Sequence, residues 1–393
     1  MKSKWLPSIL FAIFLGLYSI FSFSQTDPNL VLSNWDPYWN FQLKLWQLGF
    51  HQRPTATLIY IFLIFGLFST YLILLNQFKK NILTTRQALK LLIISIIILL
   101  FSYPALSHDI FNYLLNAKMV WYYRANPHIN VALDFPQEPW LKFMHNTHTP
   151  APYAYGWTIL SLIPSFIGQH SLKLALLLFK IFVILWFAFL LRFQYFLGRQ
   201  TKQRNTNHSL LIFALNPLVL IETVSNGHND VVMMALALAS CTLFLKSLKN
   251  KPVLLLPSLL LLLASASIKY ATIIILGSFL LFIAFKKLKT FWSFGGIAAI
   301  TMFSPLVTTR SQRFLPWYLI WPLSFFPAIN EKIIRELLIV FSFSSLLRYA
   351  PFLYHGEYSS IVISQRQLIT FLLPLFYFLF RFIFPKLALK RLL

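Results

Sequence analysis

The sequence predicts an all-α polytopic membrane protein with about twelve transmembrane helices, in a range of about 11 to 13, and with large outer loops. Two observations predict this class. Of the 393 residues, 58% are hydrophobic and only 11% are charged, whereas soluble domains average about a quarter charged residues. In addition, apolar runs of about 20 residues, the length that crosses a bilayer, recur from one end of the chain to the other.

The apolar runs can be assigned in order. The first, 6–24, follows Lys2 and Lys4 and lacks a clear small-residue cleavage site, so we interpret it as a retained helix rather than a signal peptide. The later runs predicted to span are 55–76, 89–106, 171–197, 209–224, 230–247, 252–268, 270–286, 290–307, 315–328, 333–350 and 363–385. The shorter segment 154–169 is compatible with a half-helix, a re-entrant piece or a full span.

The net charge of +24 reflects membrane topology. Lysine and arginine cluster in short segments between apolar runs, which the positive-inside rule places in the cytoplasm, so nucleic-acid binding is not indicated. These segments read NQFKKNILTTRQALK, GRQTKQRN, KSLKNK, FKKLK and KLALKRLL. With Met1 inside, two large loops, about 25–54 and 107–153, lie outside. We divide the chain into N-terminal helices with the first loop (1–88), a core containing the second loop (89–330) and C-terminal helices (331–393).

A carboxylate opens the second large outer loop. Asp109 directly follows an apolar run, where a partly desolvated acid can act as a base or a metal ligand. The alternative is capping, with Ser107 or Asp109 at the start of a helix through 110–123. Asp36 precedes a proline in the first outer loop, a pattern more typical of a turn.

The segment NPLVLIETVSNGHND (216–230) combines an intramembrane acid with a polar turn. Glu222 lies in an apolar run, where polar groups are costly and often functional. Asn226-Gly227 is a helix-ending signal, and His228, Asn229 and Asp230 follow it. One of the last two is expected to be the N-cap of the next helix, but capping explains neither Glu222 nor the three polar side chains together.

Cations and aromatic rings also gather on the predicted outer side. Lys269, Arg310 and Arg313 are suited to an anionic lipid headgroup, while snorkelling is the alternative. Interfacial aromatic belts explain most of the rings, yet rings beside a carboxylate and neutral polar groups also suit a sugar. Walker, GxGxxG, HExxH and CxxC motifs are absent from the sequence, which argues against an ATP-driven pump, a dinucleotide enzyme and a zinc protease.

The chain resembles the membrane-embedded GT-C glycosyltransferases, especially the mannosyltransferase-like branch that uses polyprenyl-phosphate sugars. The resemblance rests on five segments that follow the family's order between positions 107 and 322: SHDIFNYLLNAKMVWYYRANPH, TPAPYAYGWTIL, LNPLVLIETVSNGHNDVVMMALALA, SIKYATIIIL and PWYLIWPL. The family's catalytic aspartate matches Asp109, with Asp36 competing if the core starts at the first helix. Its asparagine-proline matches Asn126 and Pro127, where His128 replaces the usual tyrosine.

The resemblance implies a GT-C-like fold in the cell membrane. The implied reaction transfers a sugar, with mannose the leading candidate, from a polyprenyl-phosphate donor to a hydroxyl of a glycan or lipid acceptor on the extracytoplasmic side. Asp109 would be the base, or would hold a divalent cation such as Mg²⁺ or Mn²⁺. The expected substrate-binding residues are His108, Asn112, Tyr113, Arg124, Asn126, Tyr153, Tyr155, Glu222, His228, Asn229, Asp230, Lys269, Tyr270, Arg310, Trp317 and Tyr318. A transporter or lipid flippase is the alternative.

Overall fold

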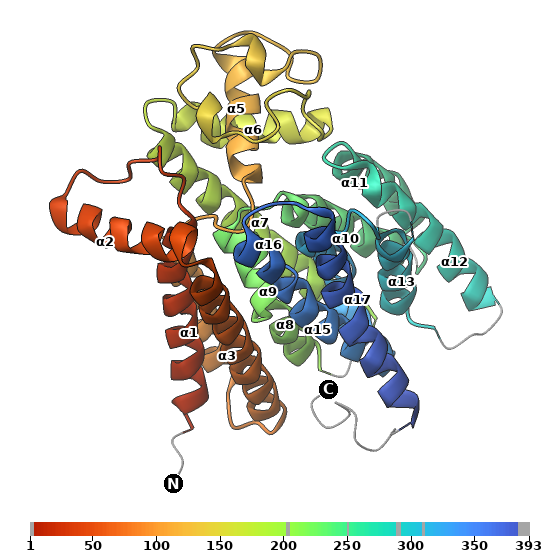
Figure 1. The fold of residues 1–393 in the computed structure, drawn as a ribbon. Helices are drawn as coiled ribbons and strands as arrows, with labels where there is room; N and C mark the ends of the chain where they lie inside the picture. Colours follow the sequence, from red (N-terminus) through yellow and green to blue (C-terminus); the bar gives the residue numbers. More distant parts are fainter. Residues whose placement is uncertain (1–3, 202–204, 250, 288–291, 309–310, 384–393) are drawn as a thin grey trace.

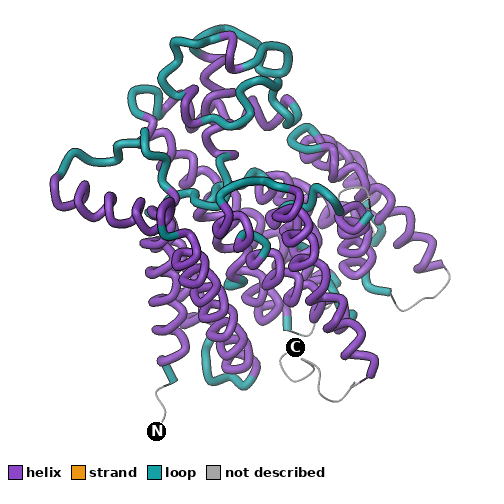
Figure 2. The backbone as a smooth tube through the Cα atoms, in the orientation of Figure 1, coloured by secondary structure: helices purple, strands orange, loops and turns teal. Residues whose placement is uncertain are grey.

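The computed structural model describes residues 4–201, 205–249, 251–287, 292–308 and 311–383. These residues form helices and loops and contain no strand, which confirms the all-α class (Figures 1 and 2). The helices are α1 (Leu6–Ser22), α2 (Asp36–Trp46), α3 (Arg53–Lys79), α4 (Thr85–Leu100), α5 (Asp109–Trp121), α6 (Tyr155–Ile167), α7 (Leu172–Gln200), α8 (Thr206–Ala214), α9 (Pro217–Leu220), α10 (Asp230–Ser247), α11 (Leu255–Ala266), α12 (Ile275–Lys287), α13 (Phe294–Val307), α14 (Ile320–Leu323), α15 (Lys332–Leu347), α16 (Ala350–His355) and α17 (Ser360–Ile383).

Fewer helices than expected meet the length and apolarity of a membrane span. Among the described residues six qualify, or seven if the bent pair α8 and Pro217–Ser225 counts as one span, so the expected count of about twelve is not confirmed. The six are Leu6–Gln25, Arg53–Lys79, Leu172–Gln200, Asp230–Ser247, Lys332–His355 and Ser360–Ile383. Four other apolar helices are shorter, namely Tyr155–Ile167, Pro252–Ala266, Tyr270–Lys286 and Phe294–Val307.

The expected span at 315–328 is wrong. This segment forms three short pieces, η8 (Pro316–Leu319), α14 and η9 (Phe326–Ala328), and it is buried almost throughout. Three prolines fall within its 14 residues, and each removes a backbone N–H donor and limits helix continuation. The run is apolar because it lies inside the protein.

Two other elements differ from expectation. The run 89–106 ends its helix at Leu100, and the remaining residues form a connection that leads to α5. The first predicted outer loop contains α2, whose proline at the second position suits a first helical turn. Its mixed polar and aromatic sequence gives no apolar run, so hydropathy did not indicate it.

The arrangement of the helices brings separate parts of the chain to one end of the bundle. In Figure 1, α5 and α6 stand at that end, and Figure 2 shows long loop segments around them. Below them α10 packs against both α7 and α11, and the π-helical η5 (Ile221–Ser225) packs against α4 and α7. The starts of α5 and α10 therefore lie close together.

Candidate active site

Asp109 is the first residue of α5 and faces the other polar segment. The hydroxyl of Ser107 accepts a hydrogen bond from the Asp109 backbone N–H at 3.2 Å, and α5 begins without a side-chain cap, so the Asp109 side chain does not serve as one. That side chain is 18% exposed, and its Oδ2 lies 3.6 Å from Nδ1 of His228. The Tyr113 hydroxyl, one helical turn later, donates to the same oxygen at 3.4 Å.

His228 reaches Asp109 because the chain turns sharply just before it. Gly227 has φ of +71°, in the left-handed region that favours glycine, and a Cβ there would lie 3.0 Å from the side chain of Ile110. The turn follows η5, and π-helical turns of this kind often occur at functional sites. The helix end predicted at Asn226-Gly227 is therefore the turn that follows η5, and this turn directs His228 toward the start of α5.

Glu222 faces the other ring nitrogen of His228, Nε2, and is fully buried. Its Oε2 is 3.2 Å from His228 Nε2 and accepts a hydrogen bond from Asn226 Nδ2 at 2.8 Å. Its Oε1 accepts from the Tyr349 hydroxyl at 2.9 Å. A buried carboxylate needs such partners. The result is a continuous series from Asp109 through His228 to Glu222 and Tyr349.

Asp230 and Lys269 form an ion pair beside this series. Lys269 Nζ lies 2.8 Å from Asp230 Oδ2, and Trp321 Nε1 donates to Asp230 Oδ1 at 2.5 Å. The Lys269 side chain is 15% exposed, whereas Asp230 is buried. The ammonium also lies 5.8 Å from the ring of Tyr153 and 5.7 Å from that of Tyr318.

Asn229 lies at the N-cap position of α10 but does not cap it with its side chain. The residue is fully buried, and both its Oδ1 and its Nδ2 have no hydrogen-bond partner among the described residues. Buried amides are nearly always hydrogen-bonded, so an unpaired one beside Asp230 is a candidate contact for a polar ligand.

Aromatic rings enclose the cluster. Trp317 stacks on His228 with ring centres 3.8 Å apart. Tyr113 contacts the rings of Tyr153 and Trp157 edge to face. These rings give the site the mixture of apolar faces and polar groups that sugar binding uses.

The charges of the cluster stabilise one another. Burial would raise the pKa of Asp109, but the adjacent His228, and then the charge of Lys269, hold it below its usual value. Burial would lower the pKa of His228, but the carboxylates of Asp109 and Glu222 raise it to about 8. At neutral pH an imidazolium therefore lies between two carboxylates.

The family comparison can be set against this geometry. The family model described as alpha-(1->6)-mannopyranosyltransferase, N-terminal domain (MptA_B family), matches residues 24–285. The chain belongs to this family. The match confirms the resemblance to mannosyltransferases, and a mannosyl transfer function is supported. No curated protein and no solved structure matches the chain.

The mannosyltransferase match includes Asp109, Glu222, His228, Asp230 and Lys269. Trp317, Trp321 and Tyr349 contact these residues from beyond its end. Sequence reasoning did not assign Asn226, Trp321 or Tyr349 to the site. Asn226 belonged to the polar turn already noted, whereas Tyr349 is 127 residues from Glu222 and gave no local signal.

Other expected site residues of the chain lie around the cluster. His108 stacks on His145 at 3.8 Å, and burial, followed by the charge of His145, lowers its pKa to about 4. Asn112 is buried with an unpaired Oδ1. Asn126 Nδ2 donates to the Tyr155 hydroxyl at 3.3 Å; within the described residues no hydrogen bond joins this pair to Asp109. Arg124 and Tyr270 are exposed, and Arg310 lies outside the described residues.

A metal ion does not fit the residues around Asp109. Mg²⁺ and Mn²⁺ prefer several oxygen ligands. In the described ranges no group of three His, Cys, Asp or Glu side chains could hold a metal ion. Asp109 faces an imidazole, and the nearby carboxylate of Asp230 is occupied by Lys269 and Trp321. We therefore derive no step through a metal.

The raised pKa of His228 predicts a pH profile for mannosyl transfer. The imidazolium persists up to about pH 8 and is lost above it, whereas Asp109, with its lowered pKa, stays ionised through the neutral range. We expect the initial rate to be flat near neutrality and to fall as pH rises through about 8.

The matched control for this profile is the exposed His51. His228→Gln, which cannot become charged, should lower the rate at neutral pH and remove the alkaline limb, while His51→Gln should keep both. An alkaline limb that persists unchanged in the His228→Gln enzyme would show that another group titrates.

Proposed function

We propose that this protein transfers a mannosyl residue from a polyprenyl monophosphate donor to an acceptor hydroxyl on the extracytoplasmic side of the membrane, as a GT-C glycosyltransferase. The family match, which covers the Asp109 cluster, carries the proposal. The family's description names an α-(1→6) transferase, so the proposed acceptor group is a primary hydroxyl at C6 of a mannose in a glycan or lipid.

In this proposal Asp109 acts as the base. Its Oδ atoms receive the proton of the acceptor hydroxyl as the acceptor oxygen bonds to C1 of the sugar. The bond between C1 and the phosphate oxygen breaks at the same time, and the lipid phosphate leaves with the electron pair. Resemblance to the GT-C enzymes implies inversion at C1. The His228 imidazolium, 3.6 Å away, orients Asp109 and stabilises its charge before the transfer.

The donor phosphate is proposed to lie against Lys269. The ammonium shares its charge with Asp230, yet it remains partly exposed and lies near Asp109. A leaving phosphate gains negative charge as its bond to C1 breaks, and a fixed cation stabilises that charge. The rings of Tyr153 and Tyr318 and the unpaired amide of Asn229 would hold the sugar.

The location at one end of the bundle suits this chemistry. The donor has a long apolar chain that stays in the bilayer, and the acceptor hydroxyl comes from water. The reacting atoms meet only at the boundary between the two. In this proposal Asp109, at the start of α5, would lie at such a boundary, next to the candidate membrane spans.

Sealed right-side-out vesicles that contain the protein test three parts of the proposal at once: the lipid-phosphate donor, the sugar and the side of the membrane. They would carry polyprenyl-phosphate mannose, polyprenyl-phosphate glucose or no donor, with a membrane-impermeant α-mannoside acceptor added outside. We expect acceptor-dependent transfer only with polyprenyl-phosphate mannose. Transfer from a nucleotide sugar, or transfer only in inside-out vesicles, would contradict the donor or the side. Lipid movement without transfer would indicate a flippase.

A further inference from the structure

Two buried arginines, Arg348 and Arg366, lie near Tyr349. Arg348 directly follows α15 and is 3% exposed, and Arg366, in α17, is 8% exposed. Arg348 Nη1 donates to the Thr370 hydroxyl at 2.9 Å, and its guanidinium lies over the ring of Phe314. Arg366 lies over the ring of Tyr358. The Nε atoms of both arginines are buried and have no hydrogen-bond partner in the described chain.

The charge of these arginines is not balanced by a carboxylate. Among the described residues none lies within ion-pair distance of either guanidinium. Glu222, which accepts from Tyr349 next to Arg348, already has Asn226 and His228 as its other partners. Buried charges are normally paired. Two unpaired guanidiniums with buried, unused donors therefore indicate a missing anion.

Helical periodicity connects the arginines with an apolar face below them. On α17, residues at intervals of three and four share a face, and Arg366, Thr370, Leu373, Tyr377 and Phe380 follow that spacing. On α15 the same applies to Val340, Ser344 and Arg348. The Ser344 hydroxyl donates to the carbonyl of Thr370 at 3.0 Å, so the two faces meet between the arginines and the apolar residues.

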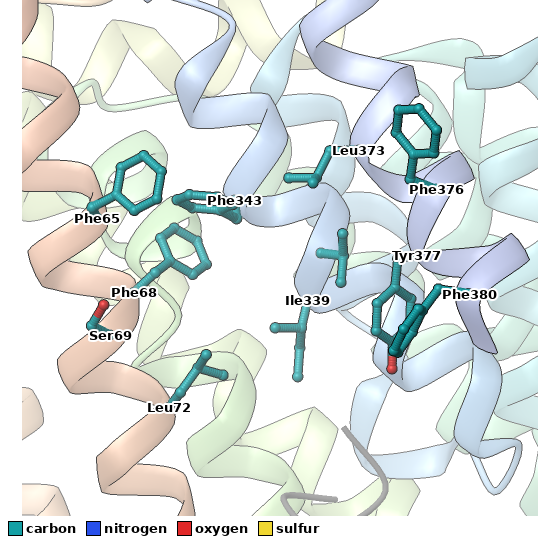
Figure 3. A pocket seen from close by; sticks show the side chains of 11 residues that line it. Phe65, Phe68, Ser69, Leu72, Ile339, Phe343, Leu373, Phe376, Tyr377 and Phe380 are labelled. Carbon is teal, nitrogen blue, oxygen red and sulfur yellow. The ribbon is translucent and has the colours of Figure 1, made fainter. Parts of the chain in front are cut away.

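The apolar residues line a groove between α3, α15 and α17 (Figure 3). Its volume is about 530 Å³, within the range of drug-sized ligand sites, so the open groove holds part of an acyl chain rather than a whole lipid. Phe65, Phe68 and Leu72 border it on one side and Phe376, Tyr377 and Phe380 on the other. At about 1.5 Å per residue, its upper residue Leu373 lies roughly 10 Å along α17 from Arg366.

We propose that this surface binds one anionic phospholipid of the surrounding bilayer, with its phosphate on Arg348 and Arg366 and part of an acyl chain in the groove. Bidentate guanidinium contacts suit a phosphate, and the groove supplies the apolar surface that acyl chains fill. The lipid would also connect α17 to α3. Only 17% of the apolar window of α17 is buried by the rest of the protein, so it otherwise depends mainly on α15 and α16.

The donor lipid fits this surface less well. Arg348 directly precedes Tyr349, whose hydroxyl donates to the buried Glu222, and Glu222 lies 3.2 Å from the buried His228 beside Asp109. A donor phosphate on the arginines would place its sugar on the far side of that series from the base. Lys269, by contrast, lies 5.8 Å from the ring of Tyr153, which packs against Tyr113, the residue that donates to Asp109.

Lipid retention in full-length protein tests the proposal. The protein would be purified from nanodiscs of equal phosphatidylglycerol and phosphatidylcholine, and retained lipid would be counted by native mass spectrometry. We expect one phosphatidylglycerol per chain. The variant Arg348→Gln with Arg366→Gln should lose this preference about tenfold or more, the size of a lost charge-assisted contact. Arg192→Gln, an exposed arginine of α7, is the matched control and should retain it.

A second variant keeps the test decisive if the arginine variant folds poorly. Ser69 lines the groove and is exposed, so Ser69→Trp should fill the groove without disturbing the packed core, and should reduce retention with both arginines present. Equal retention of phosphatidylcholine, or full retention in both variants, would overturn the proposal. So would displacement of the phospholipid by polyprenyl monophosphate together with a raised donor KM in the arginine variant, which would assign the surface to the donor.

Discussion

Asp109→Asn is expected to abolish mannosyl transfer almost completely while the protein folds and inserts normally. The amide keeps the size of the side chain but removes its charge and nearly all of its basicity. Loss of a general base typically lowers the rate by about 10²–10⁴-fold. We expect a decrease of that size in kcat for the purified variant, with little change in the donor KM. We expect folding to be preserved because the Asp109 side chain caps no helix and its backbone N–H, which bonds to Ser107, is unchanged.

Asp36→Asn provides the control, because Asp36 was the competing candidate for the base. Asp36 is exposed at the first residue of α2, a position where an acid favours the helix N-terminus. Its replacement should leave kcat within a few-fold of the unmodified protein. An inactive Asp36→Asn protein beside an active Asp109→Asn protein would move the catalytic base to the first large loop.

The site could be predicted in part because its polar residues are unusual where they occur. An acid within an apolar run, Glu222, and a polar turn directly after it singled out His228 and Asp230. The pairing of these residues with Asp109 and Lys269 could not be predicted, because it depends on which helices pack together. Tyr349 and Trp321 illustrate this limit. Each is an ordinary aromatic in sequence, and each becomes part of the site only through a distant hydrogen bond.

The fold was predictable where length and apolarity agree. Arg53–Lys79 and Leu172–Gln200 are long apolar helices, and both were expected from hydropathy. Hydropathy fails at 315–328, because an apolar segment buried in protein has the same composition as one that faces lipid. It also fails at α2, because the polar residues of this helix leave no apolar run. The assignment of 1–88, 89–330 and 331–393 as separate parts stays a prediction.

The Lys269–Asp230 ion pair changes the effect that replacing Lys269 is expected to have on stability. On the sequence alone, a headgroup contact of Lys269 predicts that Lys269→Met weakens donor use far more than folding. Because the structure pairs Lys269 with a fully buried Asp230, the single variant leaves an uncompensated charge inside the protein. Breaking a buried ion pair in this way costs about 3–5 kcal/mol. We therefore expect Lys269→Met to melt well below the unmodified protein in detergent, which would obscure any effect on the donor.

The double variant Lys269→Met with Asp230→Asn separates stability from donor binding. The introduced amide is neutral and can still accept the hydrogen bond from Trp321, so the melting temperature should return close to normal. If Lys269 contacts the donor phosphate, the donor KM of the double variant should remain raised by about 10–100-fold, the size of a charge-assisted contact. Asp230→Asn alone keeps the ammonium and should retain donor affinity. A stable double variant with a normal donor KM would restrict Lys269 to pairing with Asp230, and the phosphate would then require another cation.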